Sequence, residues 1–235
     1  MNFYAIIMAA GSGTRMGGST PKQFLMLDGK PVLRHTIERF IKAFPDGHIV
    51  TVLPKGFIRY WNEYCLESGF HCPQHVVEGG ITRYHSVRNA LERVPDGAIV
   101  AIHDAVRPLV SPDFLRELVS KMGTERAVVP VVSMVDTLKV LRRDAEGRLS
   151  LSKGECADRN VVYGAQTPQV FRAEDIREAY RQAYDMNFTD DASVAQRNDL
   201  PLTFVEGRRY NIKITTPQDL EVVELLLKSQ SFTQT

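Results

Sequence analysis

The sequence has few cysteines, and the three present, Cys65, Cys72 and Cys156, are scattered and form no C-x-x-C pair. An odd number of separated cysteines makes no disulfide framework and is typical of the reducing cytoplasm. Cys65 and Cys72 could ligate a metal together with His71 or His75, but no second cysteine pair completes a zinc site. The residues therefore favour a cytoplasmic protein with free thiols.

Long apolar runs are also absent, so no segment is predicted to span a membrane. The short apolar start, residues 3–10, has no basic region before it and no cleavage-like segment after it, which argues against a signal peptide. The 29 Lys and Arg residues are balanced by 28 Asp and Glu residues, for a net charge of +1. This balance predicts no nucleic-acid or membrane partner, so any anion site must come from local clustering.

What is present is ordinary for a globular protein: 235 residues, of which 43% are hydrophobic and 24% charged. Strand-like and helix-like segments alternate, which predicts an α/β fold with a mostly parallel sheet and helices on both faces. The expected strands span residues 3–10, 48–53, 75–78, 98–103, 126–131 and 202–206. The expected helices span residues 31–44, 57–68, 81–94, 112–122, 173–185, 190–197 and 217–228. Because we find no repeat and no linker, we predict a single domain over residues 1–235.

Residues 133–163 interrupt this alternation. Within them, apolar residues alternate with polar ones on both sides of a turn at residues 144–147. This pattern predicts a β-hairpin arm inserted into the domain. An inserted hairpin usually covers either a site or a partner subunit.

The most informative stretch follows the first predicted strand. It is a glycine-rich loop, Gly11–Gly18, that leads into Pro21-Lys22-Gln23. Small residues after a buried strand let backbone N–H groups approach an anion closely, and Arg15 and Lys22 add two cations that can hold phosphate oxygens. The loop lacks the lysine of G-x-x-x-x-G-K-[ST] and the third glycine of G-x-G-x-x-G. It therefore indicates a polyphosphate site, with a purely structural turn as the alternative.

Three further polar clusters follow predicted strands, where ligands bind in parallel sheets. Gly79-Gly80 opens a predicted helix and exposes backbone donors, His103 to Arg107 end a predicted strand, and Lys213 lies between two isoleucines. Each cluster has a plain structural alternative. Gly79-Gly80 could be a simple strand-to-helix turn, and Lys213 could be a solvated surface lysine. His103 could be a buried structural histidine beside an Asp104–Arg107 ion pair.

The pattern A-A-G-x-G-x-R-M…P-K-Q resembles the signature loop of nucleotidyltransferases, which join a nucleoside triphosphate to a phosphorylated sugar or alcohol. It is most similar to the cytidylyltransferase branch, and within that branch to the 2-C-methyl-D-erythritol 4-phosphate cytidylyltransferase family. The motifs G-G-x-x-R-x-x-S, H-D-A-x-R-P, D-T-[LI]-K, D-R…T-P-Q and N-I-K-[VI]-T-x-P follow in order, so the resemblance covers residues 3 to about 225. It implies a Rossmann-like, twisted sheet of the nucleotide-diphospho-sugar transferase type.

The resemblance also implies a reaction. CMP would pass from CTP to 2-C-methyl-D-erythritol 4-phosphate, giving 4-CDP-2-C-methyl-D-erythritol and pyrophosphate, in the non-mevalonate route to isoprenoid precursors. Mg²⁺ would assist, carried mainly by the CTP phosphates, with Asp104 as a candidate ligand. Two alternatives stay open: a ribitol-5-phosphate cytidylyltransferase, which has a similar loop, and a non-catalytic nucleotide-binding module on the same fold.

By this resemblance, residues can be assigned to roles. The expected catalytic cations are Arg15, Lys22, Arg159 and Lys213. The expected nucleotide-binding residues are Ala9, Ala10, Gly11, Ser12, Gly13, Thr14, Gly80, Arg83, Ser86, Asp104 and Ala105. The expected substrate-binding residues are Arg107, Thr137, Arg159, Thr167 and Lys213. In the family it resembles, the arm interlocks with its mate in a homodimer, which implies that Thr137 and Arg159 enter the neighbour's site.

Overall fold

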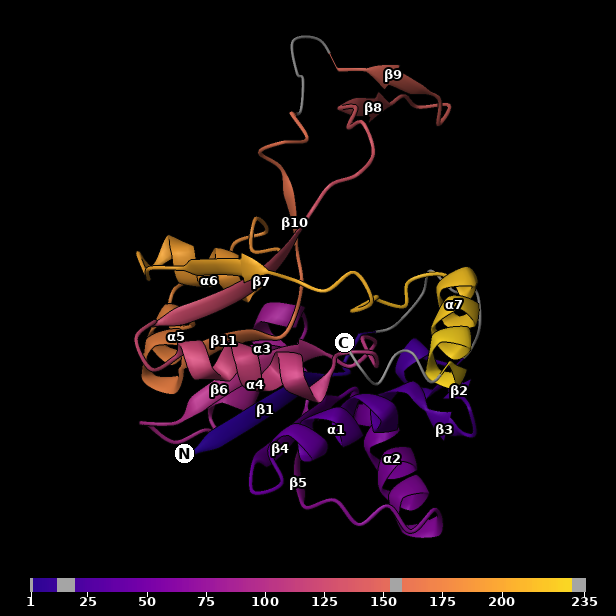
Figure 1. The fold of residues 1–235 in the computed structure, drawn as a ribbon, viewed down its shortest axis with the longest axis vertical. Helices are drawn as coiled ribbons and strands as arrows, with labels where there is room; N and C mark the ends of the chain where they lie inside the picture. Colours follow the sequence, from indigo (N-terminus) through magenta and orange to yellow (C-terminus); the bar gives the residue numbers. More distant parts are fainter. Residues whose placement is uncertain (1, 12–19, 153–157, 230–235) are drawn as a thin grey trace.

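A computed structural model of the protein describes residues 2–11, 20–152 and 158–229 (Figure 1). Its main sheet contains β1 (Phe3–Met8), β4 (His48–Leu53), β5 (Gln74–Glu78), β6 (Ile99–Asp104), β7 (Ala127–Ser133), β10 (Tyr163–Ala165), β11 (Gln169–Arg172) and β12 (Thr203–Glu206). The order is β10-β7-β11-β6-β1-β4-β5, and β12 also pairs with β7. The pairs of β1 with β4 and β6, of β4 with β5, and of β7 with β12 are parallel, whereas β10 and β11 run antiparallel to their neighbours. The predicted mostly parallel sheet is confirmed.

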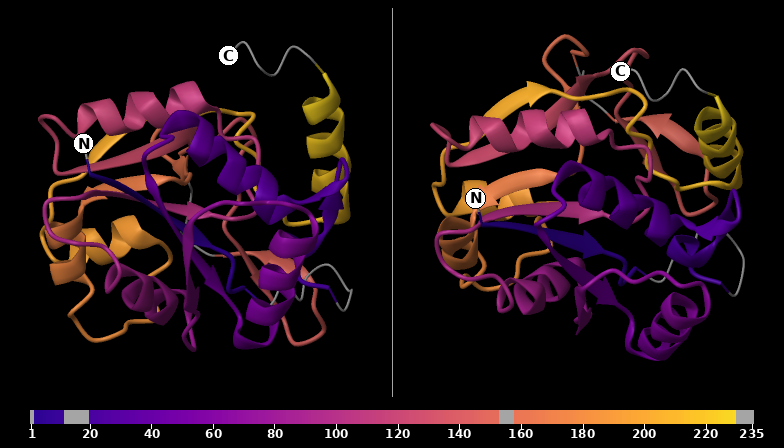
Figure 2. Two further views of the ribbon diagram at one scale, coloured as in Figure 1. Left: turned by 90° about the horizontal axis from the view of Figure 1, so that it is seen from below. Right: turned by 60° about the horizontal axis from the view of Figure 1, so that its bottom comes forward.

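Helices cover both faces of the sheet, as predicted (Figure 2). One core joins the sheet to α1 (Val32–Ala43), α2 (Lys55–Glu67) and α4 (Pro112–Lys121). The other joins it to α3 (Arg83–Leu91), α5 (Ala173–Ala179) and α6 (Asp191–Arg197). The strand β1 explains why both faces need cover, because alternate side chains along a strand point to opposite faces. In β1 the side chains of Phe3, Ala5 and Ile7 enter the first core, and those of Tyr4, Ile6 and Met8 enter the second.

A third, smaller core lies beside the site, under α7 (Pro217–Lys228), and includes Leu27 and Ile214. The helix begins where the sequence predicts, because the Thr216 side chain accepts the backbone N–H of Asp219 and Pro217 occupies the first turn. Three short elements that we did not predict lie nearby: η2 (Lys22–Phe24), β2 (Met26–Leu27) and β3 (Lys30–Pro31). They connect the glycine-rich loop to α1.

Two further differences concern the second half of the chain. β11, a strand of four residues between β6 and β7, was not predicted. The helix expected at 173–185 ends at Ala179. The carbonyl oxygens that a longer helix would use are taken by side chains, because Ala179 accepts from Gln182 Nε2 and Tyr180 accepts from Tyr84 Oη. Tertiary contacts thus override the helical pattern of the sequence.

The predicted hairpin arm is confirmed in outline. It leaves the sheet after β7, forms the antiparallel pair β8 (Leu141–Arg143) and β9 (Leu149–Leu151), and returns as β10. The arm projects away from the body of the molecule (Figure 1). No helix in the described ranges is long and apolar enough to cross a bilayer.

Candidate active site

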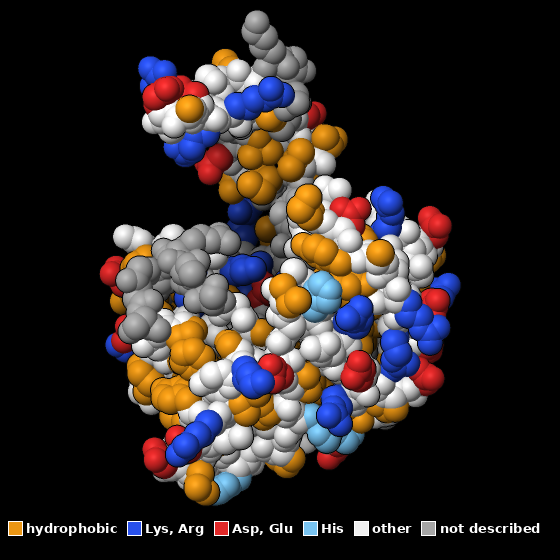
Figure 3. Space-filling view, turned by 180° about the vertical axis from the view of Figure 1, so that it is seen from behind, with side chains coloured by type: hydrophobic (Ala, Val, Ile, Leu, Met, Phe, Trp, Pro, Cys, Tyr) orange, Lys and Arg blue, Asp and Glu red, His pale blue; other side chains and the backbone are white. Residues whose placement is uncertain are grey.

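A cavity of about 670 Å³ lies where β1 and β6 end and α3 begins. Figure 3 shows basic side chains gathered in a hollow between the arm and the body. The described lining residues come from five separate segments of the chain. They are Met8, Ala9, Ala10, Gly11, Lys22, Gln23, Gly80, Ile81, Thr82, Arg83, Ser86, Asp104, Val106, Lys213, Ile214 and Thr215. The segments that follow β1, β5 and β6 therefore contribute to one cavity, as expected for the carboxyl ends of parallel strands.

The start of the glycine-rich loop is held by the segment that follows it. Gln23 Nε2 donates to the carbonyl oxygens of Ala9, at 2.6 Å, and Gly11, at 3.2 Å. Lys22 is buried beside it and its Nζ donates to the Thr215 carbonyl oxygen at 2.6 Å. Lys22 therefore lines the cavity with its ammonium group held by the Thr215 carbonyl oxygen. The expected ligands Ser12, Gly13, Thr14 and Arg15 lie outside the described residues.

The loop before α3 is packed too closely for side chains. A Cβ atom on Gly79 would lie 2.4 Å from Ala10 Cβ, and one on Gly80 would lie 2.5 Å from His85 Cβ. Ser86 fixes the loop from the helix, because its Oγ accepts the Gly80 N–H at 3.0 Å and donates to the Thr82 carbonyl at 2.9 Å. Gly79 therefore lets this loop approach the residues that follow β1, and Gly80 lets it pack against α3.

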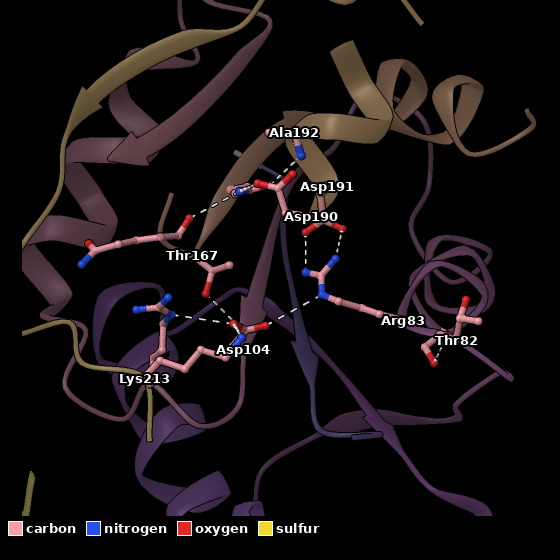
Figure 4. Close-up of polar contacts among 12 residues, drawn as sticks. Thr82, Arg83, Asp104, Thr167, Asp190, Asp191, Ala192 and Lys213 are labelled. Carbon is pink, nitrogen blue, oxygen red and sulfur yellow. Dashed lines mark hydrogen bonds and ion pairs between the residues drawn. The ribbon is translucent and has the colours of Figure 1, made fainter. Parts of the chain in front are cut away.

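Asp104 is the central carboxylate of the cavity wall (Figure 4). Its oxygens lie 2.8 Å from Lys213 Nζ, 3.7 Å from Arg107 Nε and 3.9 Å from Arg83 Nε. Burial opposes ionisation of this group, but the charges of Arg83, Lys213 and Arg107 outweigh it and hold its pKa well below the usual range. Asp104 is therefore ionised at neutral pH, and its charge holds Lys213 at the cavity.

Other expected residues support this wall and are not among the described lining residues. The Thr167 Oγ accepts the backbone N–H of Asp104 at 3.0 Å. Arg107 is buried and donates to the Asn211 carbonyl oxygen at 2.6 Å, which ties the segment before Lys213 to β6. Ala105 is buried as well, and its carbonyl accepts the Thr36 hydroxyl. In this structure the three residues position Asp104 and Lys213.

His103 is a structural residue. It is fully buried, its Nε2 lies 3.2 Å from the Arg107 carbonyl oxygen, and its ring packs against Phe40. Burial lowers the pKa of the imidazole to about 4, so it is neutral at physiological pH. This agrees with the structural alternative that the sequence offered.

Thr137 and Arg159 lie on the arm and not in the cavity of their own chain. Both side chains are exposed, and Arg159 Nη1 donates to the Val135 carbonyl oxygen at 3.2 Å, which places it near the base of the arm beside the Thr137 segment. Like Arg107 and Thr167, these two expected substrate contacts are therefore not among the described residues that line the cavity of their own chain.

Several residues of the site were missed by sequence reasoning. Gln23 stood in the P-K-Q motif, so its support of the loop could have been found. Asn211, whose Nδ2 donates to the Thr167 carbonyl oxygen at 2.7 Å, stood in the N-I-K motif. Asp191, which pairs with Arg83, carried no signal, because its partner is distant in the sequence and only the fold brings them together.

The described residues offer little for a resident metal. They contain no group of three or more His, Cys, Asp or Glu side chains that could hold an ion. Asp104 is the one carboxylate among the described residues that line the cavity. A single carboxylate suits a Mg²⁺ ion that arrives on substrate phosphates and keeps most of its water.

The chain is similar to known proteins in both sequence and fold. A family model described as "IspD: 2-C-methyl-D-erythritol 4-phosphate cytidylyltransferase" matches residues 3–229. The chain is 44% identical over 227 residues to a Porphyromonas gingivalis protein of that name, covering 96% of this chain and 98% of the relative. It is 41% identical to one from Phocaeicola vulgatus, covering 97% and 100%. A solved Francisella tularensis structure of that name matches with a TM-score of 0.77 and 30% identity, covering 96% of this chain and 99% of that one.

Proposed function

The chain belongs to the 2-C-methyl-D-erythritol 4-phosphate cytidylyltransferase family, and on this premise we propose how its cavity transfers CMP from CTP to 2-C-methyl-D-erythritol 4-phosphate. The observation that carries the proposal is the cavity itself. It unites the end of β1, the Gly79-Gly80 loop, Lys22 and the Asp104–Lys213 pair. Lys22 and Lys213 supply cations, which a triphosphate and a second phosphate require, and the small residues let phosphates approach the backbone.

In the reaction, a phosphate oxygen of the alcohol phosphate attacks the α-phosphorus of CTP in line. The new P–O bond forms as the bond to the β-phosphate breaks, and pyrophosphate leaves with that electron pair. Because the nucleophile is already an anion, no general base is needed, and catalysis rests on positioning and preorganised cations. We assign Arg15 and Lys22 to the α-phosphate in the transition state. Arg159 and Lys213 position the attacking phosphate.

The loop geometry suggests how cytosine is read. Ala10 and Gly80 both line the cavity, and Ser86 fixes Gly80. Because the Gly80 N–H already donates to Ser86, Gly80 offers the base its carbonyl oxygen. A carbonyl accepts a hydrogen bond from the exocyclic amine of cytosine, whereas uracil presents an oxygen at that position. This difference supports a preference for CTP.

Mg²⁺ fits the cavity as an ion brought by CTP. Asp104 is the protein carboxylate that would contact it, and Lys213 and Arg83 balance the charge of Asp104. When bound, Mg²⁺ neutralises phosphate charge and favours the departure of pyrophosphate. The protein's own part is to hold the triphosphate oxygens through Lys22 and the loop.

The arm supports a homodimer. It exposes large apolar side chains, which a partner would cover: Val135, Leu141, Leu149, Leu151 and Val161. Thr137 and Arg159 stand on this arm, away from their own cavity, so a partner's cavity is their place of action. Free Cys65 and Cys72 and the balanced charge support a cytoplasmic enzyme whose partners are small molecules and a second copy.

Steady-state turnover of two polyol phosphates at fixed CTP tests the choice of substrate. We expect kcat/KM for 2-C-methyl-D-erythritol 4-phosphate to exceed that for ribitol 5-phosphate by at least about a hundredfold, because a site built for one polyol leaves polar groups unpaired with another. Equal values would remove the assignment of this alcohol. A higher value for ribitol 5-phosphate would reassign the chain to the alternative reaction.

Gly79→Ala tests the nucleotide loop. The new Cβ would overlap Ala10 Cβ at 2.4 Å, so the loop must move away from the end of β1. We expect KM for CTP to rise by about one to two decades, because the base and triphosphate lose their fixed backbone partners. The matched control is Gly56→Ala in α2, where an added Cβ meets nothing within 4 Å. A normal KM in Gly79→Ala would show that this loop does not contact CTP.

A further inference from the structure

Arg83 lines the cavity and pairs with a carboxylate other than Asp104, that of Asp191. Its Nη1 donates to Asp191 Oδ1 at 2.8 Å and its Nη2 donates to Asp191 Oδ2 at 2.6 Å. This is the bidentate arrangement in which an Arg–carboxylate pair is strongest. Its Nε is the atom that approaches Asp104, at 3.9 Å. Figure 4 shows the guanidinium of Arg83 between the two carboxylates.

Asp191 itself is fixed more firmly than a surface carboxylate. Its side chain is fully buried, and its Oδ1 also accepts the Tyr180 hydroxyl at 2.6 Å. It stands at the first position of α6, after the N-cap Asp190, whose side chain accepts the Ser193 N–H at 2.8 Å. Gln169 reinforces the turn, because its amide donates to Asp190 and accepts the Ala192 N–H. The Asp191 carboxylate therefore has one orientation.

The consequence reaches Lys213. Asp104 pairs with Lys213 at 2.8 Å and with Arg83 at the longer distance of 3.9 Å. A guanidinium with free terminal nitrogens beside a carboxylate tends to form the bidentate pair. Arg83 does not form it with Asp104 because Asp191 occupies both terminal nitrogens. The Asp104 oxygens thus remain with Lys213.

We propose that Asp191 is a positioning residue that keeps Arg83 off Asp104, so that Asp104 holds the Lys213 ammonium at the cavity. Its kinetic consequence rests on the proposed function, in which Lys213 positions the attacking phosphate. Without the charge of Asp191, Arg83 turns onto Asp104 and displaces Lys213. Asp191 touches neither substrate; it acts through Arg83.

Chemical labelling of Lys213 tests this geometry without turnover. Lys213 is about half exposed and open to an amine-acylating reagent, and an ammonium held by a carboxylate is acylated more slowly than a free one. In Asp191→Asn we expect the labelling rate of Lys213, measured by mass spectrometry relative to exposed Lys55, to rise about threefold to tenfold, as for the loss of one ion pair. The matched control is Asp190→Asn, which removes the neighbouring charge; in the described part of the chain, the Asp190 carboxylate contacts Gln169 and Ser193, whereas Arg83 pairs with Asp191. It should label as wild type.

Kinetics provide the second readout. In Asp191→Asn we expect KM for 2-C-methyl-D-erythritol 4-phosphate to rise about tenfold, whereas Asp190→Asn should keep the wild-type KM. KM does not depend on the fraction of folded enzyme. A purely structural role would lower the melting temperature and the apparent kcat but would leave KM and Lys213 labelling unchanged, and that result would overturn the proposal.

The Arg83→Gln background shows whether the effect passes through Arg83. There we expect Asp191→Asn to cause no further change in Lys213 labelling, because no guanidinium remains to move. An equal rise in the Lys213 labelling rate in both backgrounds would contradict the proposal.

If Asp191→Asn does not fold, Asp191→Glu serves as the second variant. It keeps the charge and pushes Arg83 toward Asp104, so we expect a smaller rise in the Lys213 labelling rate. No rise would count against the proposal. Should wild type not consume CTP while labelling changes as expected, the proposed function fails and the positioning role stands.

Discussion

Replacing Lys22 with alanine should lower kcat by about two to four decades, the usual range for removal of a preorganised charge that acts in the transition state. Lys22 is buried at the cavity, and its Nζ is held by the Thr215 carbonyl oxygen at 2.6 Å, so the ammonium needs no reorganisation when charge develops on the α-phosphate. Steady-state kinetics with saturating CTP and alcohol phosphate measure the change. Arg15→Ala should behave alike, because Arg15 belongs to the glycine-rich loop that leads into Lys22.

The matched control is Lys55→Ala. Lys55 is largely exposed, lies 3.9 Å from Glu78 and is not among the described residues that line the cavity. Its loss should leave kcat within about twofold of wild type, as for surface charges in general. If folded Lys22→Ala turns over at the wild-type rate, the loop between β1 and η2 is not the catalytic centre.

An equal mixture of Lys22→Ala and Arg159→Ala proteins, refolded together, should recover about a quarter of wild-type activity. Half of the dimers formed at random are mixed, and in each of these one of the two sites has an intact Lys22 from one chain and an intact Arg159 from the other. Each variant alone should be nearly inactive. The motivation is the exposed position of Arg159 on the arm, outside its own cavity.

The control for this experiment is a mixture of Lys22→Ala and Arg15→Ala proteins. The sequence motif assigns both residues to one nucleotide site, so every site in a mixed dimer keeps a defect and no activity should return. If the Lys22→Ala and Arg159→Ala mixture also shows no recovery, the arm does not complete the neighbour's site. A monomer in solution under assay conditions would contradict the dimer directly.

The fold was predictable where the sequence pattern and the environment agree. β1, β4 and β6 are buried on both faces and appear as continuous apolar runs, which is the signature of strands in a covered parallel sheet. β11 was missed because four residues, Gln169–Arg172, are too few to show a period, although they lie in the middle of the sheet. The antiparallel insertion of this strand depends on partners that are distant in sequence.

The site was predictable to a similar extent as the fold. Gly80, Asp104 and Lys213 follow strands, so a parallel sheet had to bring them to one edge, and the cavity contains all three. Which charge pairs with which did not follow from the motifs. The sequence allowed an Asp104–Arg107 pair, whereas in the structure the closest partner of Asp104 is Lys213. The selection depends on Asp191, which holds Arg83 and which no local pattern connects to the site.

The most direct test of cytidylyl transfer at this cavity is product formation by the wild-type enzyme with each nucleoside triphosphate in turn. With 2-C-methyl-D-erythritol 4-phosphate and Mg²⁺ present, CTP should give pyrophosphate and the CDP-linked alcohol in equal amounts, detected by phosphorus NMR. UTP, ATP and GTP should react at least about a hundredfold more slowly if, as we propose, the Gly80 carbonyl oxygen accepts the cytosine amine. Equal turnover of UTP, or no pyrophosphate from CTP, would contradict the account.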